Sequence, residues 1–106
     1  MTFNISSALL EACVLSSLEQ EDAYGYILTQ KVKEVMSISE STLYPVLRRL
    51  LNTGYLMAYD QPFQGRNRRY YHLTDVGKDQ LETYRKDWII YRGQVDKILM
   101  GGVQSD

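Results

Sequence analysis

The chain has 106 residues, of which 44% are hydrophobic, and its formal net charge at pH 7 is -1. This length suits one domain with a single core, and the apolar content excludes a disordered chain, which would lack the apolar surface that offsets ordering entropy. No run approaches the about 18 apolar residues of a membrane span, and residues 1–10 lack the features of a signal peptide, so we expect a cytoplasmic protein.

Groups suited to catalysis or metal binding are scarce in the chain. Cys13 is the only cysteine, which excludes an intrachain disulfide and a multi-thiolate zinc site. It lies in an apolar run, so we expect a small buried hydrophobe, with a redox role as the alternative. We expect no carboxylate or second nucleophile near His72, the only histidine, which then is an ordinary strand residue. The sequence therefore predicts no enzyme, no metal and no cofactor.

Two amphipathic helices are expected in the first third of the chain. Residues 7–19 and residues 26–36 each carry apolar side chains at helical spacing, and the first pattern ends in the charged stretch EQED. The expected core positions are Leu9, Leu10, Cys13, Val14 and Leu18 in the first helix and Ile27, Leu28, Val32 and Val35 in the second.

A third helix follows, with an unusual outer side. Ser39 is a suitable N-cap and Gly54 a suitable stop. The predicted core face consists of Leu43, Val46, Leu47, Leu50 and Leu51, and the opposite stripe of Ser41, Pro45, Arg48 and Asn52, flanked by Thr42, Tyr44 and Arg49. The stripe contains no acid and offers groups that hydrogen-bond bases or phosphates, although an exposed helix with two arginines for solubility is the alternative. Pro45 should kink or tighten the first turns.

A β-hairpin is predicted next. The aromatic-rich runs YLMAYD (55–60) and RRYYHL (68–73) read as strands, and Pro62 and Gly65 between them are expected to form the turn. Arg66, Arg68 and Arg69 then fall at or beside the tip. Alternation along the second strand puts Leu73 on the core side.

The charge is concentrated in the middle of the chain. Residues 1–40 carry two basic and six acidic side chains, residues 41–72 five and one, and residues 73–106 five and six. A local cationic segment is typical of phosphate binding. A mainly α fold of three helices, a small β-hairpin and a basic third helix is the plan of a winged helix-turn-helix, which we expect in residues 1–74. The third helix would enter the major groove of double-stranded DNA, and the hairpin tip would reach backbone or minor groove.

The last segment, residues 75–106, is predicted to be a dimerisation helix with a short tail, packed with the rest as one compact unit. Thr74 caps the helix, which would run about 37 Å to Leu99 at 1.5 Å per residue, too long to pack wholly on so small a domain. Gly93 is a candidate break. A coiled-coil-like seam at spacings of 3, 4, 3, 4 and 3 consists of Leu81, Tyr84, Trp88, Tyr91, Val95 and Ile98.

This seam has alternative interpretations. It could fold back onto the chain's own helices instead of pairing with a second copy. Tyr84, Trp88 and Tyr91 either pack at the dimer interface or also line a cavity for a small planar aromatic effector, for which aromatic faces are suited.

Three motifs resemble the PadR-like transcriptional regulators. AYGYILTQ, STLYPVLRRLLNTGYL and RNRRYYHLTDVG agree in order and spacing with the family pattern over residues 7–99, and the short C-terminal part is similar to the small subfamily with one long last helix. The resemblance implies a homodimer that represses transcription at an inverted repeat and releases DNA when a small molecule binds. It places Ser41, Thr42, Tyr44, Pro45 and Arg48 in the recognition helix, and it gives phosphate or minor-groove contact to Arg66, Arg68 and Arg69.

Two rival functions share the fold. A winged-helix protein–protein adaptor without DNA binding should carry an apolar outer stripe on the third helix, which this sequence lacks. An RNA-binding winged helix would be recognised by competition between duplex DNA and RNA.

Overall fold

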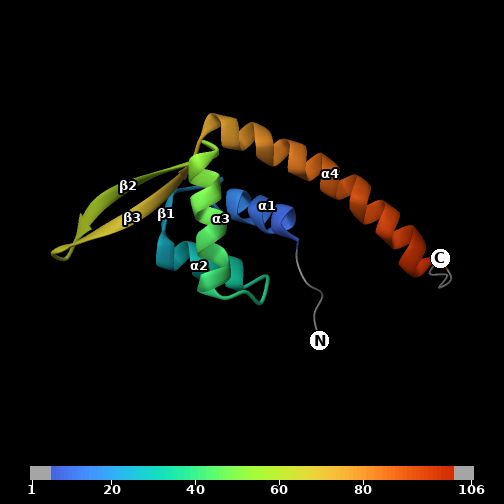
Figure 1. The fold of residues 1–106 in the computed structure, drawn as a ribbon, viewed down its shortest axis with the longest axis horizontal. Helices are drawn as coiled ribbons and strands as arrows, with labels where there is room; N and C mark the ends of the chain where they lie inside the picture. The colour runs from blue at the N-terminus through green and yellow to red at the C-terminus, as the bar shows by residue number, and fades with distance from the viewer. Residues whose placement is uncertain (1–5, 102–106) are drawn as a thin grey trace.

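Three short helices, a β-hairpin and one long helix follow one another along the chain (Figure 1). The structure is a computed structural model and describes residues 6–101, so the end of the predicted tail, residues 102–106, lies outside the described residues. The elements in order are α1 (Ser7–Ser17), β1 (Ala23–Tyr24), α2 (Gly25–Lys33), α3 (Glu40–Asn52), β2 (Leu56–Phe63), β3 (Arg66–Leu73) and α4 (Asp75–Met100). The predicted fold class, a winged helix-turn-helix with a long C-terminal helix, is confirmed.

The ends of α3 and the start of α4 follow the predicted signals. The Ser39 hydroxyl accepts a hydrogen bond from the Thr42 amide at 3.3 Å, and the Thr74 hydroxyl caps α4 in the same way. Gly54 has a φ of 84°, and the amide of Tyr55 bonds back to the carbonyl of Leu50 at 3.0 Å. This left-handed glycine after the last helical turn is what stops α3.

The core contains most of the residues predicted from periodicity, with corrections in α1 and α2 and at Leu51 of α3, which is only half-buried. Leu9 and Cys13 are only half-buried, and burial raises the pKa of the Cys13 thiol. Leu15, which was not predicted, is fully buried. Val35 is 77% exposed because α2 ends two residues before it, and Ile27 is also exposed. The buried set is Leu10, Val14, Leu15, Leu18, Ala23, Leu28, Val32, Leu43, Val46, Leu47, Leu50, Leu56, Tyr71, Leu73 and Leu81.

The sheet has three antiparallel strands in the order β1-β3-β2. The two-residue β1, which was not predicted, pairs Tyr24 with Tyr70 of β3. The hairpin strands are longer than predicted because the turn is only Gln64 and Gly65, with φ values of 51° and 78°, as a tight hairpin turn requires. Pro62 is therefore not a turn residue. It lies in β2, which as an edge strand tolerates a residue without an amide hydrogen.

The long helix α4 determines the elongated shape, whose principal extents are 59 × 30 × 23 Å. It extends over α1 and beyond it, while the β2–β3 hairpin projects at the opposite end (Figure 1). The helix is continuous through Gly93, so the break considered there is absent. Among residues 6–101, no helix is long and apolar enough to cross a membrane.

Candidate nucleic-acid interface

The outer side of α3 is exposed along its whole length. Ser41, Thr42, Tyr44, Pro45 and Arg48 are all exposed, while the buried side chains of α3 lie on the opposite side. The hydroxyls of Ser41 and Thr42 lie 2.9 and 3.1 Å from that of Ser39, which gathers three hydroxyl groups at the helix start. The helix therefore presents hydroxyl groups at its first turn and a guanidinium group further along.

Arg49, which the sequence placed on the flank of this surface, is engaged by α1. Its Nε donates to Oε2 of Glu11 at 2.7 Å, and its Nη2 donates to the Ser7 hydroxyl at 3.0 Å. The Glu11 side chain is only 14% exposed. The guanidinium of Arg49 thus ties α3 to α1, unlike that of its neighbour Arg48.

The three arginines of the hairpin lie in different surroundings. Arg66 and Arg69 are exposed. Arg68 is half-buried, and its guanidinium carbon lies 3.5 Å from the ring centroid of Phe63 and 4.1 Å from that of Tyr24. Stacking of a guanidinium between two aromatic rings is a cation–π arrangement. Arg68 therefore joins the outer part of the hairpin to β1, a contact that the sequence did not predict.

An aromatic stack continues from this arginine to the base of the hairpin. The Tyr70 ring lies 5.6 Å from Tyr24 and 5.6 Å from Tyr59. The Tyr59 hydroxyl donates to Oδ2 of Asp22 at 2.6 Å. The hairpin is thus connected to the loop between α1 and β1.

The expectation that His72 has no carboxylate nearby is wrong. Its Nδ1 lies 2.8 Å from Oδ1 of Asp22. Burial alone would raise the pKa of Asp22, but the hydrogen bonds from Tyr59 and His72 hold it below its ordinary value. The pair is separated by 50 residues in the chain, so sequence proximity gave no indication of it. The carboxylate bonds both hairpin strands and so fixes the base of the hairpin to the body.

The predicted seam on α4 divides into a buried and an exposed part. Leu81 is 2% exposed and belongs to the core of the chain itself, because the first turns of α4 pack against the other elements. Tyr84 and Val95 are half-buried. Trp88, Tyr91 and Ile98 are 40%, 60% and 83% exposed. Further exposed apolar side chains that the seam did not include are Ile89, Ile90, Leu99 and Met100.

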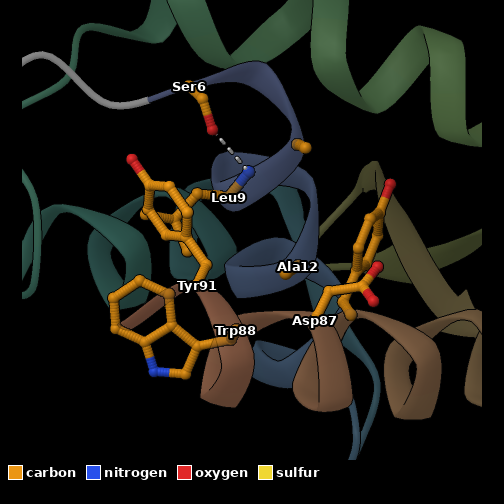
Figure 2. A pocket seen from close by; sticks show the side chains of 8 residues that line it. Ser6, Leu9, Ala12, Asp87, Trp88 and Tyr91 are labelled. Atoms are coloured by element: carbon orange, nitrogen blue, oxygen red, sulfur yellow. Dashed lines mark hydrogen bonds between the residues drawn. The ribbon is translucent and has the colours of Figure 1, made fainter. Parts of the chain in front are cut away.

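A cavity of about 490 Å³ lies between α1 and α4 (Figure 2). Tyr84, Trp88 and Tyr91 line it, and the centroids of the Trp88 and Tyr91 rings are 6.3 Å apart. Its other lining residues, which the sequence did not indicate, are Ser6, Ala8, Leu9, Ala12 and Asp87. The cavity therefore combines aromatic faces with one carboxylate.

Tyr84 connects this cavity to the body of the protein. Its hydroxyl donates to Oε1 of Glu11 at 2.7 Å. Burial, followed by the hydrogen bond to Glu11, raises the pKa of Tyr84 to about 12, so the phenol keeps its proton at neutral pH. Within residues 6–101, no group of three or more His, Cys, Asp or Glu side chains is arranged to hold a metal ion.

Comparison with known proteins identifies the family. The model of the transcriptional regulator PadR-like family matches residues 14–83, from α1 into the first turns of α4. The chain belongs to the PadR-like family. It is 32% identical over 74 residues to the transcriptional regulator Rv3488 of Mycobacterium tuberculosis, with 69% of each chain covered.

Solved structures agree with the PadR-like assignment. Protein smu.1704 of Streptococcus mutans is 42% identical over the full length of both chains, with a TM-score of 0.86. The PadR-like transcriptional regulator BC4206 of Bacillus cereus is 32% identical, covers 92% of this chain and 94% of its own, and has a TM-score of 0.78. The resemblance inferred from the three motifs is confirmed, and the PadR-like family is one of transcriptional regulators rather than enzymes.

Proposed function

We propose that this PadR-like regulator binds double-stranded DNA sequence-specifically as a homodimer, with α3 in the major groove. The observation that carries the proposal is the exposed outer side of α3, where hydroxyl groups and Arg48 project from the face opposite the core. The major groove accepts an α-helix and presents a distinct pattern of donors and acceptors for each base pair. The second function considered, a protein–protein adaptor, is not favoured by this polar surface.

The arginines take different roles in this proposal. Arg48 contacts base edges, since only α3 is shaped to enter the groove. Arg66 and Arg69 contact phosphate, because both are exposed on the hairpin. Arg68 and Arg49 position the hairpin and α3, because their guanidinium groups already have partners within the chain.

The exposed apolar half of α4 supports dimerisation. Contiguous apolar patches are rarely left in water by soluble monomers, and here Trp88, Tyr91 and Ile98 lie on a helix that extends beyond α1. A second copy of α4 would cover this surface. Two α3 helices would then meet an inverted repeat whose half-sites lie about one helical turn apart.

The cavity between α1 and α4 supports a ligand-responsive repressor. Trp88 and Tyr91 offer faces for stacking, and the Asp87 carboxylate favours a cation, so the effector would be a planar aromatic cation. Such a ligand releases DNA to the extent that it binds the free dimer more tightly than the DNA-bound dimer.

The test begins with selection of duplexes from a random pool by the purified protein. Arg48→Ala should reduce the preference for the selected operator over a scrambled duplex by about 1–3 kcal/mol, because it removes a base contact. The control is Arg66→Ala, which should weaken both duplexes alike. Equal losses on both duplexes for Arg48→Ala would contradict base reading by α3.

A further inference from the structure

One carboxylate joins three helices. Glu11 on α1 accepts from Arg49 of α3 at Oε2 and from Tyr84 of α4 at Oε1, and both distances are 2.7 Å. Its side chain is 14% exposed, so the carboxylate has little access to water. Hydrogen bonds to an ionised carboxylate are among the stronger ones in proteins, especially where water is largely excluded. Glu11 is thus held from both sides by partners on separate helices.

The two partners of Glu11 belong to the two sites of the proposed function. Tyr84 lines the cavity between α1 and α4. Arg49 is adjacent to Arg48 on α3. We propose that Glu11 is a positioning residue that couples occupancy of this cavity to the orientation of α3. The proposal rests on DNA binding by α3, and it adds a physical connection between the cavity and that helix.

The coupling follows from the shared carboxylate. A group that enters the cavity and displaces the Tyr84 hydroxyl removes one of the two partners that orient Glu11. The carboxylate then rotates or shifts, and the hydrogen bond that holds Arg49 changes with it. Because Arg49 also bonds Ser7 at 3.0 Å, this one guanidinium makes polar contacts from α3 to α1 in addition to the apolar core that the two helices share. A loss of orientation at Glu11 therefore loosens the contact between α3 and α1.

A second tie between α1 and α4 provides a matched control. Arg85 of α4 forms an ion pair at 2.7 Å with Glu19, two residues beyond the end of α1, and also bonds Ser16 of α1 at 3.4 Å. None of these partners belongs to α3. Glu19→Gln thus removes the same kind of charge as Glu11→Gln and weakens the attachment of α4 to the C-terminal end of α1, but it leaves the contact to α3 intact.

The test uses fluorescence anisotropy to measure the affinity for the operator and for a scrambled duplex. The proteins are the wild type, Tyr84→Phe, Glu11→Gln, the double variant and the control Glu19→Gln. Tyr84→Phe, which removes only the hydroxyl, should lower the ratio of operator affinity to scrambled-duplex affinity by about threefold. Glu11→Gln should lower it at least as much. The double variant should equal Glu11→Gln alone, because Tyr84 acts through Glu11. Glu19→Gln should leave the ratio unchanged.

Two results would overturn the coupling. The first is that Tyr84→Phe leaves the affinity ratio unchanged. The second is that Tyr84→Phe lowers the ratio as much in the Glu11→Gln variant as it does in the wild-type protein. Tyr84→Phe preserves the ring and the packing, so it keeps the test decisive if Glu11→Gln fails to fold.

A measurement without DNA separates this proposal from the proposed function. The ¹⁵N resonance of the Arg49 Nε–H group reports the hydrogen bond to Glu11 directly. Its chemical shift should change in Tyr84→Phe and in Glu11→Gln and should be unchanged in Glu19→Gln. If the wild-type protein fails to distinguish the two duplexes, the proposed function fails, while this signal still tests the connection from Tyr84 through Glu11 to Arg49. An Arg49 signal that is indifferent to Tyr84→Phe overturns the coupling whatever the DNA result.

Discussion

Replacing Arg68 with alanine should loosen the hairpin rather than remove a phosphate contact. The guanidinium carbon lies 3.5 Å from the Phe63 ring centroid, near the hairpin tip, and 4.1 Å from the Tyr24 ring centroid on β1. The side chain is half-buried by these rings. Alanine leaves both rings without the group stacked between them, so the hairpin loses its connection to β1.

The magnitude follows from the two stacked contacts. Each cation–π contact contributes about 0.5–1 kcal/mol at a partly exposed site, so Arg68→Ala should lower the free energy of unfolding by about 1–2 kcal/mol. For a domain of this size the melting temperature should fall by about 4–8 °C for each kcal/mol lost. Thermal unfolding followed by circular dichroism measures this change.

Arg66→Ala is the matched control, because Arg66 is exposed on the same strand. It should melt like the wild-type protein but flatten the salt dependence of DNA binding by about one unit in a log–log plot. Arg68→Ala should show the reverse pattern. The reasoning is refuted if Arg68→Ala melts like the wild-type protein and flattens the salt dependence as much as Arg66→Ala does.

Three other predictions concern packing, pH and assembly. A Cβ at Gly77 would overlap the Tyr55 carbonyl oxygen, so Gly77→Ala should lower the free energy of unfolding, measured with urea, by about 1–3 kcal/mol. Gly93→Ala, which meets nothing within 4 Å, should not lower it and should raise it by up to about 1 kcal/mol, because alanine is the better helix former. Equal losses for the two variants would contradict the packing. Because the folded pKa of Asp22 is lowered, its contribution to stability is present above the ordinary pKa of aspartate and is lost as pH falls through the folded value. Asp22→Asn should therefore weaken the acid dependence of urea unfolding, and an unchanged dependence would count against the bonds to Asp22. Val95→Asp places a charge on the proposed dimer surface and should give monomer or aggregate in sedimentation, whereas a folded wild-type monomer at micromolar concentration would rule out the dimer.

The parts of the fold that follow local rules could be predicted from the sequence. The apolar stripe of α3 was predicted, as were its start at Ser39 and its stop at Gly54, because capping and helical periodicity act over a few residues. The alternation on β3 likewise assigned Leu73 to the core correctly. The two-residue β1 was not predicted, since two residues carry no periodicity and the strand exists only by pairing with β3.

The contacts that distinguish the arginines could not be predicted, because they depend on tertiary structure. Glu11 and Arg49 are 38 residues apart, and Glu11 and Tyr84 are 73 apart. The sequence assigned Arg49 to the flank of the α3 surface and Arg68 to the hairpin tip, but it gave no sign that either guanidinium has partners inside the chain. Only the fold distinguishes an arginine with partners inside the chain from one that projects from it.

The most direct test of base reading by α3 is methylation interference on the selected operator. Methylation at guanine N7 modifies an acceptor that lies in the major groove. Two clusters of interfering guanines about one helical turn apart are predicted for the wild-type protein, and interference at one guanine in each cluster should disappear in Arg48→Ala. A pool that yields no enriched sequence, or an operator whose binding is indifferent to N7 methylation, would contradict recognition through α3.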